Sequence, residues 1–540
     1  MTVIQLSPEC LYTIFKFLEE ENSLYSTLFV NREWLLVAAK ILWGDPFGVC
    51  LSPFDDEDQL DKFEKSSIDF TNSLVSFLPK IVKDTLTTTT KHLKFPESKN
   101  EKPLVDYLSL IQSLDYYQLY NYVGMWLNKT QVKSVGAHDA ASKQKKQGPQ
   151  FLLTQEICKF IIVKSGGIKQ LCLHTTIRGP FGFVLPPVMP FTKFPGANIA
   201  FEKLEYLVCI VEKEFSEIYT GLSHLSQDIK SFEILEYRQD NREFANLINV
   251  QREIQSFEYV GGDVEATPRI AEALREKAQS LINLNITGSS SIPLDIFNKS
   301  GLLESLELVG DFQVTEFGKL AETNLTKLRT LSLIFENIYV KESITLLENT
   351  NGNLTEVEIL WDNSPNNRET CERLIEAIKR FCPRCLSLEL FVEKDASKGL
   401  PSLLESLTLL ESLTIIGSIE DDDDAVHETG ESEHETEELE AINEIMSQIA
   451  NHMPRSLHVL DLGKSDWVIN ASTLANFLQK CEHKLDAPLY LELYHMSDEI
   501  RVIFEEYQDK NILTESECLR SFSGNLLEEN DDDLSPYFEE

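Results

Sequence analysis

Residues 303–308 read LESLEL, and this L-x-x-L-x-L pattern recurs along most of the chain. An internal repeat of this kind decides the fold class before any single motif does. Successive copies start between 22 and 47 residues apart, and most intervals fall between 22 and 31. The twelve copies are IKQLCL (168–173), LEYLVC (204–209), IKSFEI (229–234), IQSFEY (254–259), LINLNI (281–286), LESLEL (303–308), LRTLSL (328–333), LTEVEI (354–359), CLSLEL (385–390), LESLTI (410–415), LHVLDL (457–462) and PLYLEL (488–493).

Segments with helical periodicity separate these short apolar stretches. Residues 268–281, 368–381 and 439–453 each place apolar residues on one helical face. A strand followed by a helix, stacked about a dozen times, predicts an α/β leucine-rich-repeat solenoid with parallel strands on the concave side and helices outside. The copies lack a regular Asn or Cys after the last leucine, so we expect an irregular solenoid. The alternative is an unrelated α/β domain in which leucine-rich strands recur by chance.

The composition excludes several classes of partner. The chain has 540 residues, of which 42% are hydrophobic and 25% charged, and its formal net charge is −39. A surface that follows phosphates needs clustered Lys and Arg, so nucleic acid is not expected as a partner. We expect no secretory signal and no membrane span, because polar residues interrupt every apolar stretch. Ten cysteines fit a reducing compartment, and we expect a cytoplasmic or nuclear protein.

Residues 6–47 form an apolar segment at the start of this acidic chain. Apolar residues recur there at helical spacing in two stripes, one around Leu11–Leu18 and one around Val30–Leu42. About forty residues cannot bury that much apolar surface alone, and neither metal ligands nor paired cysteines accompany them. We therefore expect a partner protein to cover this apolar surface, with Trp34 or Trp43 as a large side chain that anchors the interface. The alternative is that these residues cap the first repeat.

The same segment resembles the F-box, the short helical module of substrate receptors in Skp/cullin/F-box ubiquitin ligases. The resemblance is best to fungal F-box proteins with loose leucine-rich repeats. It departs from the family at Ser7, because the usual Leu-Pro is replaced by Leu6-Ser7 with the proline at Pro8. The resemblance implies docking on a Skp-type adaptor, and through it on a cullin. The residues that it assigns to adaptor binding are Leu6, Pro8, Leu11, Ile14, Leu18, Leu24, Val30, Trp34, Leu42 and Trp43.

Between and beyond these two parts, four segments have distinct compositions. Residues 48–150 are predicted to be a linker and helical bridge, with a flexible loop near 133–150 whose lysines only weakly resemble a nuclear-import patch. Residues 419–440 form an acidic insertion, and residues 516–540 an acidic tail; both are expected to stay solvated. His427 and His434 in the insertion match no closed metal site, so no metal is predicted.

One position of the repeat is repeatedly acidic. In a strand, side chains alternate between the two faces, so the residue between the last two pattern positions points away from the core. An apolar residue often follows the final pattern position, which puts an apolar column beside an acidic one. We expect a surface for a basic, partly hydrophobic protein segment, although a merely solvated strand face is an equal alternative. The predicted substrate-binding residues are Glu233, Glu258, Glu307, Glu358, Glu389, Asp461 and Glu492.

An enzyme is the rival class of function. The chain has no Walker-type, dinucleotide-binding, G-x-S-x-G or H-E-x-x-H motif. Cys382 and Cys385 form a C-x-x-C pair with Cys371 upstream, but Cys385 occupies a core position of its repeat and no second pair exists. We expect structural cysteines, no catalytic residues and no cofactor.

The sequence therefore predicts a four-part chain that acts as an adaptor. The parts are an F-box-like module (1–47), the bridge (48–150), the repeat solenoid (151–515) and the tail (516–540). The module would bind the Skp-type adaptor, and the repeats would present a protein substrate for ubiquitination by other subunits. The alternative is a leucine-rich-repeat interaction scaffold that is not part of a ubiquitin ligase.

Overall fold

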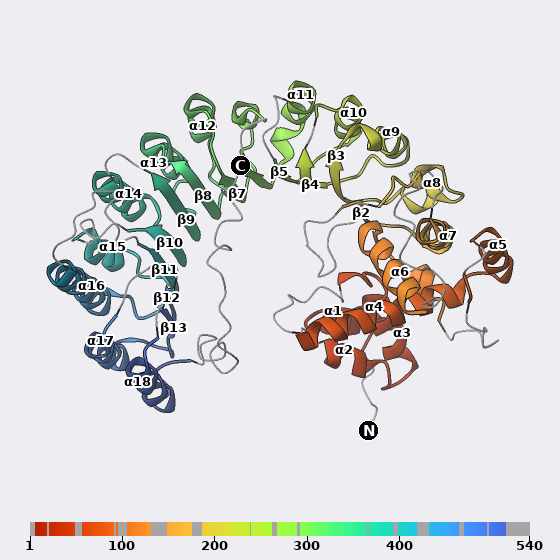
Figure 1. The fold of residues 1–540 in the computed structure, drawn as a ribbon. Helices are drawn as coiled ribbons and strands as arrows, with labels where there is room; N and C mark the ends of the chain where they lie inside the picture. Colours follow the sequence, from red (N-terminus) through yellow and green to blue (C-terminus); the bar gives the residue numbers. More distant parts are fainter. Residues whose placement is uncertain are drawn as a thin grey trace. The chain divides into compact units, whose positions relative to one another are not determined.

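The computed structural model describes residues 6–18, 21–48, 57–90, 93–95, 105–130, 148–174, 186–237, 239–261, 267–288, 292–363, 367–392, 398–417, 431–463, 469–493 and 496–514. The chain forms two compact units, Met1–Ser300 and Gly301–Glu540. Both units are mixed α/β, and most of their helices and strands are labelled in Figure 1.

The first unit begins with three short helices whose starts are encoded locally. Ser7 caps α1: its Oγ accepts a hydrogen bond of 3.3 Å from the backbone N–H three residues later, and Pro8 occupies the first helical position. Asn31 caps α3 with two bonds of 2.9 and 3.0 Å to backbone N–H groups. The proline that seemed displaced in the sequence therefore presets the first turn. The three helices are α1 (Pro8–Lys16), α2 (Glu21–Thr27) and α3 (Arg32–Leu42).

A layer of longer helices follows in the predicted bridge and extends past its boundary at residue 150. Trp126 is fully buried, and its indole Nε1–H donates to Asn72 Oδ1 at 2.6 Å, which joins the fourth and sixth helices. The elements of the layer are α4 (Glu57–Phe77), α5 (Lys80–Thr90), the 3₁₀ turn η2 (Tyr107–Leu110), α6 (Tyr116–Thr130) and α7 (Pro149–Lys164).

The sheet starts earlier than the predicted boundary at residue 151. Strand β1 lies within the bridge segment and pairs in parallel with β2. Ile111, Leu114 and Tyr116 repeat the L-x-x-L-x-L spacing with a tyrosine at the third position. The strands of the first unit follow one another in chain order and are parallel: β1 (Ser113–Asp115), β2 (Gln170–Cys172), β3 (Tyr206–Val211), β4 (Ser231–Tyr237), β5 (Ser256–Val260) and β6 (Asn283–Thr287).

The second unit continues with the same strand–helix alternation. Its strands are also parallel and in chain order: β7 (Ser305–Val309), β8 (Thr330–Asn337), β9 (Glu356–Asn363), β10 (Ser387–Phe391), β11 (Ser412–Ile416), β12 (Val459–Leu462) and β13 (Tyr490–Leu493). Each of the twelve predicted copies thus contains one of the strands β2 to β13. The prediction of a repeating α/β chain with a parallel sheet is confirmed.

Helices cover one side of the sheet in each unit (Figure 1). In the first unit the connections contain η3 (Phe191–Lys193), α8 (Ala197–Ala200), η4 (Lys213–Phe215), α9 (Ser216–Leu225), α10 (Arg242–Val250), α11 (Pro268–Lys277), η5 (Ala278–Ser280) and η6 (Leu294–Phe297). In the second unit they contain α12 (Val314–Ala321), α13 (Val340–Asn349), α14 (Asn367–Phe381), α15 (Leu400–Ser406), α16 (Glu431–His452), α17 (Ala471–Lys484) and α18 (Asp498–Asp509).

The alternation of buried and half-buried residues along each strand explains the pattern. In β7, Leu306 and Leu308 are fully buried, whereas Ser305 and Glu307 are only half-buried. Burying a leucine side chain is worth about 1.5–3 kcal/mol, so a leucine at every second position fixes which face of the strand enters the core. The leucines of the repeat form the core, and the residues between them form the opposite face of the sheet.

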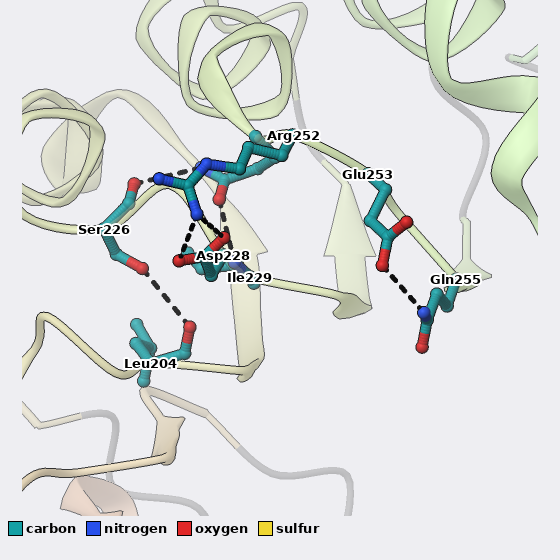
Figure 2. Close-up of polar contacts among 8 residues, drawn as sticks. Leu204, Ser226, Asp228, Ile229, Arg252, Glu253 and Gln255 are labelled. Atoms are coloured by element: carbon teal, nitrogen blue, oxygen red, sulfur yellow. Dashed lines mark hydrogen bonds and ion pairs between the residues drawn. The ribbon is translucent and has the colours of Figure 1, made fainter.

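Polar side chains join neighbouring repeats where a helix leads into the next strand. Gln251 is almost fully buried; its Nε2 donates to the carbonyl oxygen of Ser226 at 3.3 Å, and its Oε1 accepts from Ile229 N–H at 2.9 Å. At the surface of the same junction, the Arg252 guanidinium donates to both carboxylate oxygens of Asp228 at 2.9 and 3.1 Å (Figure 2). The bonds of Gln251 satisfy backbone groups that the core would otherwise leave unpaired.

Parts of the predicted acidic insertion and of the predicted flexible loop are helical. The insertion predicted at 419–440 is partly helical, because α16 begins at Glu431 and continues into the apolar stretch that anchors it. Helix α7 begins at Pro149, inside the predicted loop near 133–150. The remaining parts of these predictions, at 133–147 and 419–430, and the whole of the tail at 516–540, lie outside the described residues.

Candidate interaction surfaces

The N-terminal helices α1, α2 and α3 form a small module with its own core. That core contains Leu11 and Phe15 from α1, Leu24 from α2, and Val37 and Ala38 from α3. Trp34 packs edge-on against Phe15, with ring centroids 5.0 Å apart. The two apolar stripes recognised in the sequence therefore pack against each other within the module.

The ten predicted adaptor-binding residues divide into three groups by their exposure. Leu11 and Leu24 are buried in the core of the module. Leu18, Trp34, Leu42 and Trp43 are half-buried. Those that are exposed, and can meet a partner directly, are Leu6, Pro8, Ile14 and Val30.

Four further large apolar side chains are exposed on the module, and sequence reasoning did not single them out. Phe17 and Phe29 are 77% and 74% exposed, and Tyr25 and Leu36 are also exposed. The rings of Tyr25 and Phe29 meet edge-on, with centroids 5.4 Å apart. The available signal was their position: Phe17 and Phe29 follow the last turns of α1 and α2, off the stripes that form the core.

An open groove of about 470 Å³ lies on the same module, and the exposed Ile14 is one of the residues that line it. Apolar atoms line most of it. Serine and threonine side chains of α2 line one part, so an apolar group with a hydrogen-bonding neighbour fits its chemistry. The lining residues are Ile14, Phe15, Leu18, Ser23, Ser26, Thr27 and Trp34.

Trp43 has a different role from Trp34. Its ring packs against Tyr107, Phe70 and Phe77, at centroid distances of 4.9, 5.8 and 6.3 Å. These aromatic contacts attach the module to α4 and η2 within the first unit. Part of the apolar surface of residues 6–47 is therefore buried against the rest of the first unit.

The seven predicted substrate-binding acids occupy equivalent positions on their strands. Each is half-buried, on the face opposite the leucine core. In the first unit Glu233 lies opposite Glu258 on the neighbouring strand. In the second unit the in-register column, from β7 to β13, is Glu307, Ser332, Glu358, Glu389, Thr414, Asp461 and Glu492. The structure thus brings the predicted acids into one register within each unit.

The column of the first unit has a different character at its start. Asp115 and Cys172 lie in register on β1 and β2, followed by Val208 on β3, and all three are buried. Loss of hydration on burial raises the pKa of Asp115 to about 7, partly offset by the bond of 2.8 Å that its carboxylate accepts from Gln118 N–H. Sequence reasoning missed Asp115 because it did not recognise the first strand.

The cysteines of the C-x-x-C pair are buried structural residues. Cys382 and Cys385 are fully buried with Cys371. Burial raises the pKa of the Cys385 thiol to about 12 and shifts that of Cys382 in the same direction, so both are neutral thiols rather than reactive thiolates. Among the described residues, no group of three or more His, Cys, Asp and Glu side chains is arranged to hold a metal ion.

No protein-family model matches the chain, and no curated protein matches its sequence. No helix within the described residues is long and apolar enough to cross a membrane. A functional assignment therefore depends on the residues themselves and on the two surfaces described above.

Proposed function

We propose that the chain is a substrate receptor of a Skp/cullin/F-box ubiquitin ligase. In this proposal residues 6–47 are an F-box that binds the Skp-type adaptor, and the strand–helix units are irregular leucine-rich repeats that bind a protein substrate. The chain has no catalytic role of its own. Ubiquitin transfer is accelerated because the complex holds the substrate near the ubiquitin-loaded subunit.

The observation that carries the proposal is the exposure of large apolar side chains on a module that already has a core. Ile14, Phe17, Phe29 and Val30 remain exposed although Leu11, Phe15 and Leu24 are packed inside. Exposed aromatic and aliphatic side chains are typical of protein interfaces, where a few such anchors supply most of the binding energy. Ile14 also lines the groove of the module. Ile14 and Val30 are also among the residues that the sequence resemblance to the F-box assigns to adaptor binding.

The substrate side of the proposal is supported by the sheet face of each unit. The in-register acids and their apolar neighbours favour a basic protein segment with some hydrophobic residues. Because the net charge of the whole chain is −39, long-range attraction acts in the same direction.

A second candidate is an interaction scaffold outside any ubiquitin ligase, in which the N-terminal helices cap the repeats. The contacts of Trp43 with Phe70 and Tyr107 favour it, because they tie the module to the rest of the first unit. This candidate leaves the exposure of Ile14 and Phe29 unexplained.

Calorimetry with the purified Skp-type adaptor and the full chain tests the proposal. The informative variant is Ile14→Ala with Phe29→Ala, because both side chains are exposed and their loss leaves the module folded. Trp34 and Leu18 are unsuitable, since they pack on the core of the module. A matched control is Ile81→Ala with Ile199→Ala, which removes two side chains from α5 and α8 that are at least as exposed.

We expect the wild-type chain and the control to bind with similar affinity, and the double variant to bind at least about tenfold more weakly, as for two interface anchors. Circular dichroism and the melting temperature should be the same for all three proteins. No binding by the folded wild-type chain would reject the receptor function and favour the scaffold.

A further inference from the structure

One face of the sheet in the second unit carries charges of a single sign. The residues that point away from the leucine core form three columns across β7 to β13. The first holds mainly serine and threonine with Glu356, and the second holds Glu307, Glu358, Glu389, Asp461 and Glu492. None of the described positions in these columns is a lysine, an arginine or a histidine.

This arrangement brings acidic side chains close together. Glu358 lies directly opposite Glu389 in the parallel ladder, and Glu356 lies two residues before Glu358 on the same face. Like charges directly opposite each other destabilise a sheet. Ser332 donates a hydrogen bond of 2.6 Å to Glu358, which orients its carboxylate but does not cancel its charge. A cationic ligand would relieve the repulsion.

The third column lies beside the acids and is apolar. Val309 pairs with Ile334, and Ile334 with Leu360, on β7, β8 and β9. Phe391 pairs with Ile416 on β10 and β11. A ligand that lies across these strands therefore meets a row of carboxylates on one side and a row of apolar side chains on the other.

The spacing of the acids decides the conformation of such a ligand. Neighbouring strands lie about 4.8 Å apart, so Glu358 and Glu389 lie about 9.6 and 14.4 Å from Glu307 along the column. In an α-helix, residues i+7 and i+11 share a face with residue i and lie about 10.5 and 16.5 Å from it, within the reach of long basic side chains. In an extended chain, about 9.6 Å corresponds to three residues, which puts the second basic residue on the opposite face.

We propose that the face formed by β7 to β11 binds a basic amphipathic α-helix of a partner protein. The helix lies across the strands, with basic residues at i, i+7 and i+11 over Glu307, Glu358 and Glu389 and an adjacent apolar stripe over Ile334 and Leu360. This inference rests on the proposed function only for naming the partner a substrate; the binding itself does not require it.

A binding titration of the full chain with synthetic helical peptides tests the inference. The matched peptide carries lysines at i, i+7 and i+11 and leucines on the adjacent stripe. A shifted peptide of the same composition carries the lysines at i, i+5 and i+9, which do not share one face. The sheet variant is Glu358→Gln with Glu389→Gln, and the control is Glu348→Gln with Glu369→Gln, which removes two exposed acids from α13 and α14.

We expect the matched peptide to bind at least about tenfold more tightly than the shifted one, which corresponds to about 1.4 kcal/mol. The sheet variant should lose at least that factor, and the control variant less than about twofold. Equal binding of the two peptides, or unchanged binding by the sheet variant, would overturn the inference.

Adaptor binding measured on the same variants separates this inference from the proposed function. If the adaptor binds and the matched peptide does not, the inference alone fails. If the peptide binds with the expected register and the adaptor does not, the receptor function fails and the face belongs to a scaffold.

Discussion

Replacing Asp115 by asparagine is expected to stabilise the chain in neutral and mildly basic solution. Asp115 ends β1 and is only 7% exposed, and burial raises its pKa from 3.8 to about 7. Its carboxylate accepts from Gln118 N–H at 2.8 Å at the start of α6. Asparagine retains an acceptor oxygen for this bond and carries no charge, so the substitution removes the buried ionisation and keeps the cap.

The size and sign of the effect follow from the two pKa values. A carboxyl group whose pKa is raised on folding contributes no penalty below pH of about 4, because it is protonated in both states. As the pH rises from about 4 to about 7, the unfolded chain ionises more readily than the folded one, and stability is lost. A difference of about three pKa units corresponds to about 4 kcal/mol, all of which is present above pH 7.

Urea unfolding of the wild type and Asp115→Asn, followed by circular dichroism at pH 5, 6, 7 and 8, measures this penalty. Other titrating groups are common to both proteins, so the difference between them isolates Asp115. The advantage of the variant should grow by about 2–3 kcal/mol between pH 5 and pH 8. A difference that stays constant over this range would refute the reasoning, because it would show that Asp115 has the same pKa in both states.

Three other substitutions and one labelling experiment follow from the same contacts. Gln251→Ala should lower the free energy of unfolding by about 2–3 kcal/mol, because it leaves buried backbone groups unpaired. The control Gln255→Ala, at the surface, should lower it by less than about 0.5 kcal/mol, and equal losses in urea unfolding would contradict this prediction. Glu358→Gln should raise the free energy of unfolding by about 0.2–1 kcal/mol at low salt and by less at high salt, and a loss of stability at both would argue against repulsion in the column. Iodoacetamide should label the exposed Cys10 in the native protein and should label Cys385 only after unfolding. Peptide mass spectrometry measures this labelling, and rapid labelling of Cys385 in the native protein would contradict its burial.

Most strands could be placed from the sequence because the signal for them is local. A leucine at every second position buries one face of the strand whatever follows it, and this rule located β2 to β13. It missed β1, because Tyr116 stands at the third apolar position and the neighbouring tyrosines and leucines have helical spacing. It also placed the predicted acids in register, since the register of parallel strands follows the core positions.

The candidate site was harder to predict, because exposure depends on which helices pack together. The sequence marks Trp34 and Trp43 alike as large anchors, but only the fold shows that Trp34 joins the core of the module and Trp43 the layer beside α4. Phe17 and Phe29 lie off the predicted apolar stripes, but only the fold shows that no other element of the described structure buries them.

The sequence by itself determined the repeating strand–helix organisation, the inward face of each strand and the acidic outward position, because these follow from short-range periodicity and side-chain alternation. Only the tertiary structure decided which apolar residues of the N-terminal module stay exposed and where the sheet begins. It also decided that Asp115 is buried while Glu358 and Glu389 are not. Burial is set by neighbours distant in the sequence, and that information is absent from any local pattern.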